Sequence, residues 1–281
     1  MTYPGRRSAD APANSTGLDR IVGGRYVPSE KKYPWMVWIR PNPTGLFMLC
    51  GGSLINDRYV LTAAQCVYEN SSATYYVVLG DLHRYITSES VSIQIPARAI
   101  PHPQFLINKT GSNLTAIDHD IALLKLETPV DFQAYPHIRP ICLPAPVSFS
   151  TGTPMTVAGW GGTNWRCREF EDGGDCNSLN GIRALKLIEA TIEVASDSVC
   201  QKNYGPLFTK NFICAQKAGK DICHVSLETR AERKNDGGDF GGPLMFRTPG
   251  SYYLNVGISS FMKGCDPQYG AAFAATGSEC S

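Results

Sequence analysis

The chain has 281 residues, 43% of them hydrophobic, which is enough to bury the core of a single large all-β unit. Its 26 basic and 25 acidic residues give a formal net charge of +1. This balance argues against nucleic-acid binding, which uses a clustered excess of Lys and Arg. No stretch approaches the roughly 18 consecutive apolar residues of a membrane span.

Residues 1–20 are rich in Pro, Ala, Ser and Arg and are predicted to form a flexible arm or activation segment. They contain no apolar run of the kind that a signal peptide has. From residue 21 onward, short apolar or alternating runs recur between Gly, Pro, Asn and Asp residues. We predict strands at residues 35–39, 75–79, 91–95, 121–126, 155–158, 185–192 and 252–258, with a Pro-rich crossing between two halves at 136–146. Helical patterns are scarce, which favours a sandwich or barrel.

Ten cysteines are scattered along the chain, and none of them falls in a Cys/His cluster with zinc-finger spacing. An even, scattered set favours disulfide bonds and therefore an oxidising compartment. Four Asn-x-Ser/Thr tripeptides agree with secretion and give candidate glycosylation sites at Asn14, Asn70, Asn108 and Asn113. We expect a secreted protein, either in a mature or partial form or with its leader encoded upstream.

Four segments resemble, in order, motifs of the chymotrypsin/trypsin (S1) family of serine proteases. They are residues 20–24 (RIVGG), 61–66 (LTAAQC), 120–126 (DIALLKL) and 238–244 (GDFGGPL), with support from 50–55, 141–144 and 158–161. The resemblance covers about residues 21–275. It implies one trypsin-like domain at 21–281, made of two six-stranded antiparallel β-barrels at roughly 21–135 and 150–281. The family's C-terminal helix is expected to be lost, unless the end is a splice or gene-model variant.

In this family a Ser hydroxyl attacks the peptide carbonyl, a His takes its proton and a buried Asp orients the His. By resemblance, Asp120 matches the orienting carboxylate, whereas Gln65 stands at the His position and Phe240 at the Ser position. A primary amide cannot act as a base near neutral pH, and a phenyl ring has no nucleophilic atom. Losing either group costs about a millionfold in turnover in a related mechanism. The degenerate triad therefore predicts that the chain is not an enzyme.

Two histidines were weighed as replacements for the missing base. His119 precedes Asp120 at a position where the family tolerates many polar residues, and His224 has no hydroxyl or thiol partner that the sequence places near it. Neither is expected to rescue catalysis.

Asp221 matches the family residue at the base of the specificity pocket, where it would select Arg or Lys. A solvated or paired loop carboxylate is an equally open interpretation, because an insertion at residues 224–237 follows. The wall of the pocket also departs from the family pattern, starting at Ser259. Phe261 falls near a family glycine that admits the substrate side chain, so its ring is expected to obstruct entry.

The junction between Arg20 and Ile21 resembles the family's activation site. The resemblance implies that cleavage there frees an ammonium group that pairs with the buried carboxylate of Asp239. We expect the cut to rearrange loops around Asp239. The alternative is an inherited feature without use.

The resemblance implies the disulfides Cys50–Cys66, Cys200–Cys214 and Cys223–Cys265. Cys167 and Cys176 lie in one inserted loop and are expected to pair, which leaves Cys142 and Cys280 to pair with each other, or Cys142 with another chain. Asp81 and Glu89 could belong to a calcium loop, but two carboxylates are a thin basis for a site of about six to eight oxygens. No metal or cofactor is predicted.

Three functions follow as hypotheses. The first is a non-catalytic serine protease homologue, a pseudoprotease that binds an extracellular protein such as a protease or protease substrate. It would act as a cofactor, decoy or regulator in a proteolytic or immune cascade. The second is a trypsin-like serine endopeptidase that cleaves after Arg or Lys by an unusual mechanism. The third is the nonfunctional product of a decayed gene.

Overall fold

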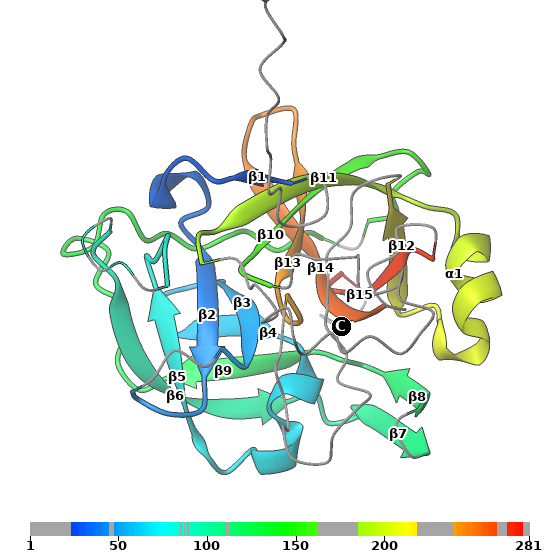
Figure 1. Ribbon diagram of the computed structural model, residues 1–281, viewed down its shortest axis with the longest axis horizontal. Coiled ribbons are helices and arrows are strands. Elements are labelled where there is room, and N and C mark those ends of the chain that lie inside the picture. The colour runs from blue at the N-terminus through cyan, green and yellow to red at the C-terminus, as the bar shows by residue number, and fades with distance from the viewer. Residues whose placement is uncertain are drawn as a thin grey trace, which may run out of the picture.

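The computed structural model describes residues 24–44, 48–84, 86, 88, 90–110, 113–145, 147–161, 185–217, 239–262 and 269–277. Over these residues the chain is mostly strand, and the strands form two barrels that lie side by side (Figure 1). Both barrels are antiparallel and six-stranded, which confirms the fold predicted from the sequence. The predicted loss of the C-terminal helix concerns residues that lie mostly outside the described part.

The first barrel is a closed ring whose strands pair in the order β2-β3-β4-β9-β6-β5. Alternation along β9 explains how it forms, because Leu124 and Leu126 are buried while Lys125 between them is exposed. Closure leaves no unpaired strand edge within the ring. The strands are β2 (Met36–Arg40), β3 (Cys50–Leu54), β4 (Tyr59–Thr62), β5 (Thr74–Leu79), β6 (Ile93–Pro101) and β9 (Ala122–Leu126).

The second barrel closes through an additional pairing between β11 and β12. Its strands follow the order β11-β10-β13-β14-β15-β12, and the short strand β1 (Arg25–Tyr26) pairs with β11 outside the ring. The chain's first described residues are thereby attached to the second barrel. The strands are β10 (Pro154–Gly159), β11 (Ile188–Val194), β12 (Phe212–Gln216), β13 (Pro243–Arg247), β14 (Tyr253–Met262) and β15 (Ala271–Ala275).

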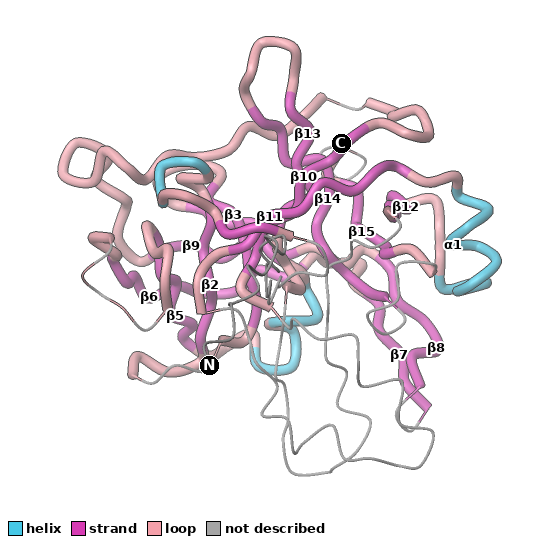
Figure 2. The backbone as a smooth tube through the Cα atoms, turned by 45° about the horizontal axis from the view of Figure 1, so that its top comes forward, coloured by secondary structure: helices cyan, strands magenta, loops and turns pink. Residues whose placement is uncertain are grey.

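The remaining elements are short. A two-stranded hairpin of β7 (Leu106–Thr110) and β8 (Asn113–Asp118) projects from the barrels (Figure 2). The α-helix α1 (Asp197–Tyr204) precedes β12, and four 3-10 helices are described: η1 (Glu30–Lys32), η2 (Ala64–Cys66), η3 (Tyr68–Asn70) and η5 (Gly205–Leu207). Over the described residues, no helix has the length and apolar character needed to cross a membrane.

One hydrophobic cluster extends across both barrels, and a second lies within the second barrel. The cluster that extends across both contains Val37 and Leu124 of the first barrel together with Ile258 and Ala274 of the second. The segment from β9 to β10 crosses between them, as predicted for residues 136–146, and Asn255 N donates a hydrogen bond to Cys142 O at 2.9 Å along this crossing. Packing of this kind holds the barrels as a single unit.

Two of the expected disulfides are present, Cys50–Cys66 and Cys200–Cys214. Cys142 carries an exposed free thiol. The other expected pairings involve Cys167, Cys176, Cys223, Cys265 and Cys280, which lie outside the described residues.

The Cys200–Cys214 bridge joins α1 to β12, with 14 residues of sequence separation. Replacing both cysteines with alanine releases this loop in the unfolded chain, so we expect the free energy of unfolding to fall by about 3 kcal/mol. Guanidinium denaturation measures the change. C142A, which removes an exposed free thiol, is the control and should leave the midpoint unchanged. Equal midpoints for all three proteins would contradict the stabilising role.

Candidate active-site region

Gln65, Asp120 and Ser260 form a closed hydrogen-bond network. Gln65 lies in η2, Asp120 two residues before β9, and Ser260 on β14 of the other barrel. Asp120 accepts from Gln65 N at 2.8 Å, from Gln65 Nε2 at 2.6 Å and from Ser260 Oγ at 2.6 Å. Gln65 Nε2 also donates to Ser260 O at 2.6 Å. Two acceptors therefore face the amide nitrogen, which fixes the orientation of the Gln65 side chain.

The carboxylate of Asp120 is fully buried. Burial raises its pKa to about 6, against the hydrogen bonds from Ser260 and Gln65, which lower it. Above that pH the group is a buried anion that is stabilised by neutral donors alone. Ser260 was missed in the sequence interpretation, because it lies at a register shift of β14, where strand alternation does not predict the direction of a side chain.

Phe240 sits on a tight turn that both barrels hold in place. Gly51 N of β3 donates to Phe240 O at 2.8 Å, and Gly241 N donates to Ser259 O at 2.9 Å. Gly241 has φ +79°, and a Cβ on it would lie 2.2 Å from Thr62 Oγ1, so only glycine fits there. The disulfide Cys50–Cys66 ties the residue after Gln65 to the residue before Gly51. The positions of Gln65 and Phe240 are therefore anchored to the same strand.

The chemistry of these two side chains is limited. The Gln65 amide donates and accepts hydrogen bonds without transferring a proton near neutral pH. The Phe240 ring is half-buried and offers only an apolar surface. What the arrangement presents is a fixed set of hydrogen-bonding groups and one aromatic ring.

Asp239 is a buried carboxylate with few partners. Gly161 N donates to its Oδ1 at 2.8 Å, whereas Oδ2 has no hydrogen-bond partner among the described residues. Gly159 and Gly161 leave room for it, since a Cβ on either would lie 1.9 or 2.4 Å from a carboxylate oxygen. Burial raises the pKa of Asp239 to about 7, and the bond from Gly161 opposes this only in part. The expected partner group at Arg20 and Ile21 lies outside the described residues.

The predicted pocket is described only in part. Ser259 is buried with an Oγ that has no partner within the described residues. The ring of Phe261 is 5% exposed and packs edge-on against Tyr204 and Phe212. Asp221 and the inserted residues 224–237 lie outside the described part, so obstruction of the pocket by Phe261 stays a prediction.

Asp81 lies in a loop of the first barrel. Trp38 Nε1 donates to it at 2.9 Å, and the buried guanidinium of Arg84 lies over the Trp38 ring at 5.1 Å. Burial raises the pKa of Asp81, against that bond and the nearby charge of Arg84. Glu89 lies outside the described residues. Over the described part of the chain, no group of three or more His, Cys, Asp or Glu side chains is placed to hold a metal ion.

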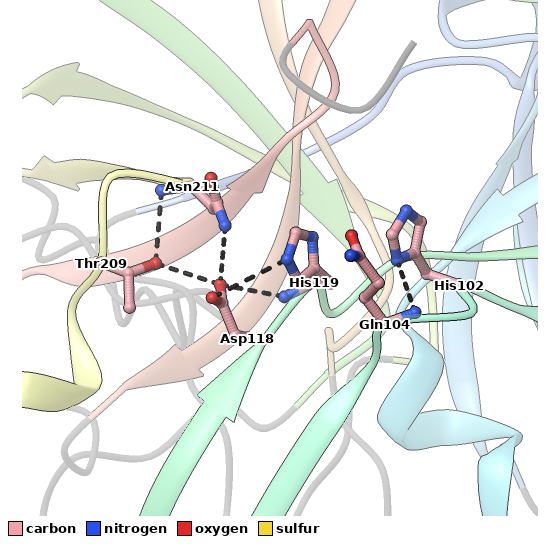
Figure 3. Close-up of polar contacts among 6 residues, drawn as sticks. All are labelled: His102, Gln104, Asp118, His119, Thr209 and Asn211. Carbon is pink, nitrogen blue, oxygen red and sulfur yellow. Dashed lines mark hydrogen bonds and ion pairs between the residues drawn. The ribbon is translucent and has the colours of Figure 1, made fainter. Parts of the chain in front are cut away.

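A polar cluster at the end of β8 joins the β7–β8 hairpin to the segment that leads into β12 of the second barrel (Figure 3). Asp118 Oδ1 accepts from Thr209 Oγ1 and from Asn211 Nδ2, both at 3.0 Å. His119 has φ +48° and turns the chain, so that Asp118 and Asp120 face different partners. The His119 ring stacks on His102 with centroids 4.8 Å apart. No local sequence pattern indicates the bonds from Thr209 and Asn211 to Asp118, because these residues are 91 and 93 positions away from it.

The candidate glycosylation sites are partly visible. Asn70 at the end of η3 and Asn108 on β7 are both exposed. Asn113 begins β8, and Asn14 lies outside the described residues. Their modification stays a prediction.

The chain is similar to known proteins in its family motifs, its sequence and its fold. The family model described as Trypsin matches residues 21–277. A tryptase from Mus musculus is 29% identical over 264 residues, which cover 91% of this chain and 84% of that protein. Among solved structures, neuropsin, a serine protease expressed in the limbic system of mouse brain, matches with a TM-score of 0.66 and 24% identity. That match covers 92% of this chain and 96% of the other, and it bears on the fold alone.

These comparisons contradict the prediction that the chain is not an enzyme. The family model that it matches is Trypsin, the sequence relative is a tryptase, and the match extends over nearly the whole chain. The prediction rested on two side chains, Gln65 and Phe240. Two substitutions in a scaffold that is otherwise similar to proteases do not exclude catalysis by the chain as a whole.

Asp239 should make stability depend on pH in the uncut protein. Its folded pKa of about 7 lies above the ordinary 3.8, so folding favours the protonated form. Stability from this group is full below about pH 4 and is lost as pH rises toward 7, by roughly 4 kcal/mol in total. D239N cannot ionise at this position. Its free energy of unfolding relative to that of the wild type should therefore increase as pH rises. Denaturant unfolding of both proteins across this range measures the difference, and parallel profiles would contradict it.

Asp118 should contribute to the attachment of the β7–β8 hairpin to the second barrel. D118A removes the acceptor of Thr209 and Asn211, so we expect the free energy of unfolding to fall by about 2 kcal/mol. D118N keeps one acceptor oxygen and should lose less. D131A is the control, because Asp131 is exposed and its side chain accepts local bonds from Gln133 N and Ala134 N. Urea unfolding should show a larger loss of stability for D118A than for D131A, and equal losses would argue against a stabilising contact between the hairpin and the second barrel.

Proposed function

Because the chain belongs to the trypsin family of serine proteases across residues 21–277, we propose that it is a secreted protein that holds a polypeptide between its two barrels. Its partner in this proposal is an extracellular protease or a protease substrate, and its setting is an extracellular proteolytic or immune cascade. The second candidate function is that of a trypsin-like endopeptidase that cleaves the bound chain after Arg or Lys. The protease relatives favour this second candidate.

The observation that carries the proposal is the network of Gln65, Asp120 and Ser260. It joins the two barrels at the place where the family binds its substrate, and every polar group that it brings together is hydrogen-bonded. A fully satisfied buried network holds its members rigidly. A rigid, preformed site loses little conformational entropy when a partner binds.

Secretion is supported by the two disulfides and by the exposed Asn70 and Asn108 tripeptides. Regulation by cleavage is part of the proposal. The carboxylate of Asp239 is buried with one hydrogen bond, and the ammonium group of Ile21, freed by a cut after Arg20, would supply the missing charge.

Hydrolysis by this chain would need a base and a nucleophile other than Gln65 and Phe240. Ser260 has a hydroxyl beside a carboxylate, but both it and Asp120 are 0% exposed, so a substrate carbonyl has no access to them as they stand. The rate of hydrolysis is therefore the measurement that separates the two candidate functions.

The test compares four proteins, each cut after Arg20: wild type, Q65H, F240S and Q65H/F240S. Reporter peptides with Arg or Lys measure turnover, and capture from extracellular fluid measures partner binding. We expect the double variant to exceed the wild type by about 100-fold or more, the scale of general acid–base catalysis. The single variants should show little increase in turnover, because base and nucleophile act as a unit.

The wild type and both single variants should capture the same partner from extracellular fluid, because the network preserves the structure of the site. A wild-type rate equal to that of the double variant would replace the binding proposal with the endopeptidase. Capture that depends neither on cleavage nor on any of the four variants would also count against the proposed site.

A further inference from the structure

Glu189 is a buried carboxylate on β11 that three side chains contact. Arg25 Nε lies 2.6 Å from it, Lys32 Nζ lies 2.5 Å from it, and the Tyr33 hydroxyl donates a hydrogen bond to it. The Glu189 side chain is 5% exposed, whereas that of Arg25 is 80% exposed. All three donors come from the first ten described residues of the chain. We name these four residues the Glu189 anchor.

The anchor is ionic at neutral pH. Burial raises the pKa of Glu189, but hydrogen bonds from Lys32, Tyr33 and Arg25 outweigh it and bring the pKa below its usual range. The same environment raises the pKa of the Tyr33 hydroxyl, chiefly through burial and then through the bond to Glu189. Tyr33 therefore stays a neutral donor, and the anchor consists of one anion between two cations. Such a group strongly favours one arrangement, because a displaced partner would leave a buried charge unpaired.

Strand register places the anchor close to Asp239. Arg25 of β1 pairs with Glu189 of β11, which pairs in turn with Ala158 of β10. The next residue on β10 is Gly159, where a Cβ would lie 1.9 Å from Asp239 Oδ1. The anchored end of β1 and the carboxylate of Asp239 are thus about two strand spacings apart, or roughly 10 Å.

Chain length makes this register important. The four residues 21–24 reach at most about 14 Å when fully extended. They can therefore span the distance from Arg25 to Asp239 with only a few ångströms to spare. A slip of β1 by one residue shifts it by about 3.3 Å, which uses most of that reserve.

We propose that Glu189 is the positioning residue of the cleavage switch. With Lys32, Tyr33 and Arg25 it fixes the register of β1, so that a cut after Arg20 delivers the Ile21 ammonium group to Asp239. This inference rests on the cleavage switch of the proposed function. A merely structural anchor would stabilise the cut and the uncut protein alike and would leave the environment of Ile21 unchanged.

The experiment measures how fast acetic anhydride modifies the Ile21 amine after cleavage, read by mass spectrometry of the N-terminal peptide. A free peptide of sequence IVGGR sets the rate for an exposed amine. We expect the wild type to react at least about 10-fold more slowly than this peptide, which corresponds to about 1.4 kcal/mol of protection. E189Q removes the anion of the anchor and should return the rate to within about twofold of the peptide.

E193Q is the matched control. Glu193 lies on the same strand, is paired with Lys217 at 2.7 Å and is 42% exposed, so its loss should leave the protection of Ile21 at the wild-type level. Y33F keeps all the charges of the anchor and removes one hydrogen bond. Y33F should partly lose the protection of the Ile21 amine. It replaces E189Q in the test if E189Q does not fold.

Two other outcomes would overturn the proposal, and they do so at different steps. If E189Q, or Y33F in its place, protects Ile21 as well as E193Q does, the anchor is overturned while the switch stands. If the wild type reacts as fast as the peptide, the cleavage switch fails and the anchor fails with it. The turnover and capture results for the four active-site variants are unaffected by either outcome.

Discussion

The carboxylate of Asp120 is the contact on which the site depends, because it belongs to one barrel and is satisfied partly by the other. Its partners are the backbone and side chain of Gln65 and the hydroxyl of Ser260. Removing Asp120 would take away the acceptor of Gln65 N and Ser260 Oγ at the boundary between barrels and would leave Gln65 Nε2 with Ser260 O alone. A second link runs from Gly51 N to Phe240 O, so backbone and side chain both hold the barrels at this place. The site is therefore part of the packing that makes the molecule one unit.

Three buried carboxylates show three ways of stabilising a charge in the interior. Asp120 has neutral donors, and burial keeps its pKa near 6. Glu189 has two cations and a hydroxyl, and its pKa falls below the usual range. Asp239 has one backbone bond, and its pKa rises to about 7. Within the described residues only the third lacks a sufficient partner, so it is the carboxylate whose state a newly formed ammonium group would change most.

Much of the fold could be predicted from the sequence, because the information is local. Alternation in residues 121–126 indicates a half-buried strand, and β9 occupies Ala122–Leu126. The family motifs around Gln65 and Asp120 likewise led to two residues that do make contact. The hairpin of β7 and β8 was missed, since its residues are largely polar and exposed and give no clear alternation of burial.

The contacts that the sequence could not predict are those between distant residues. Thr209 and Asn211 reach Asp118 across 91 and 93 residues, and Lys32 reaches Glu189 across 157. Pairing of this kind follows from the closure of the barrels, which no local pattern encodes. The same limit explains why the substitutions at Gln65 and Phe240 were given too much weight. A motif reports the identity of a side chain, whereas what the site does also depends on the groups that folding brings to it.

The arrangement of the anchor and of Asp239 has a consequence for how a cut could act at a distance. Glu189 lies on β11, and the carboxylate of Asp239, which precedes β13, lies against Gly159 of the neighbouring strand β10. Glu189 fixes where the N-terminal strand starts, and Asp239 lies directly before the turn that carries Phe240. That turn bonds to Gly51 in the first barrel and to Ser259 in the second. A charge delivered to Asp239 therefore acts on the one turn that both barrels hold, which is where a local change would reach the Gln65, Asp120 and Ser260 network.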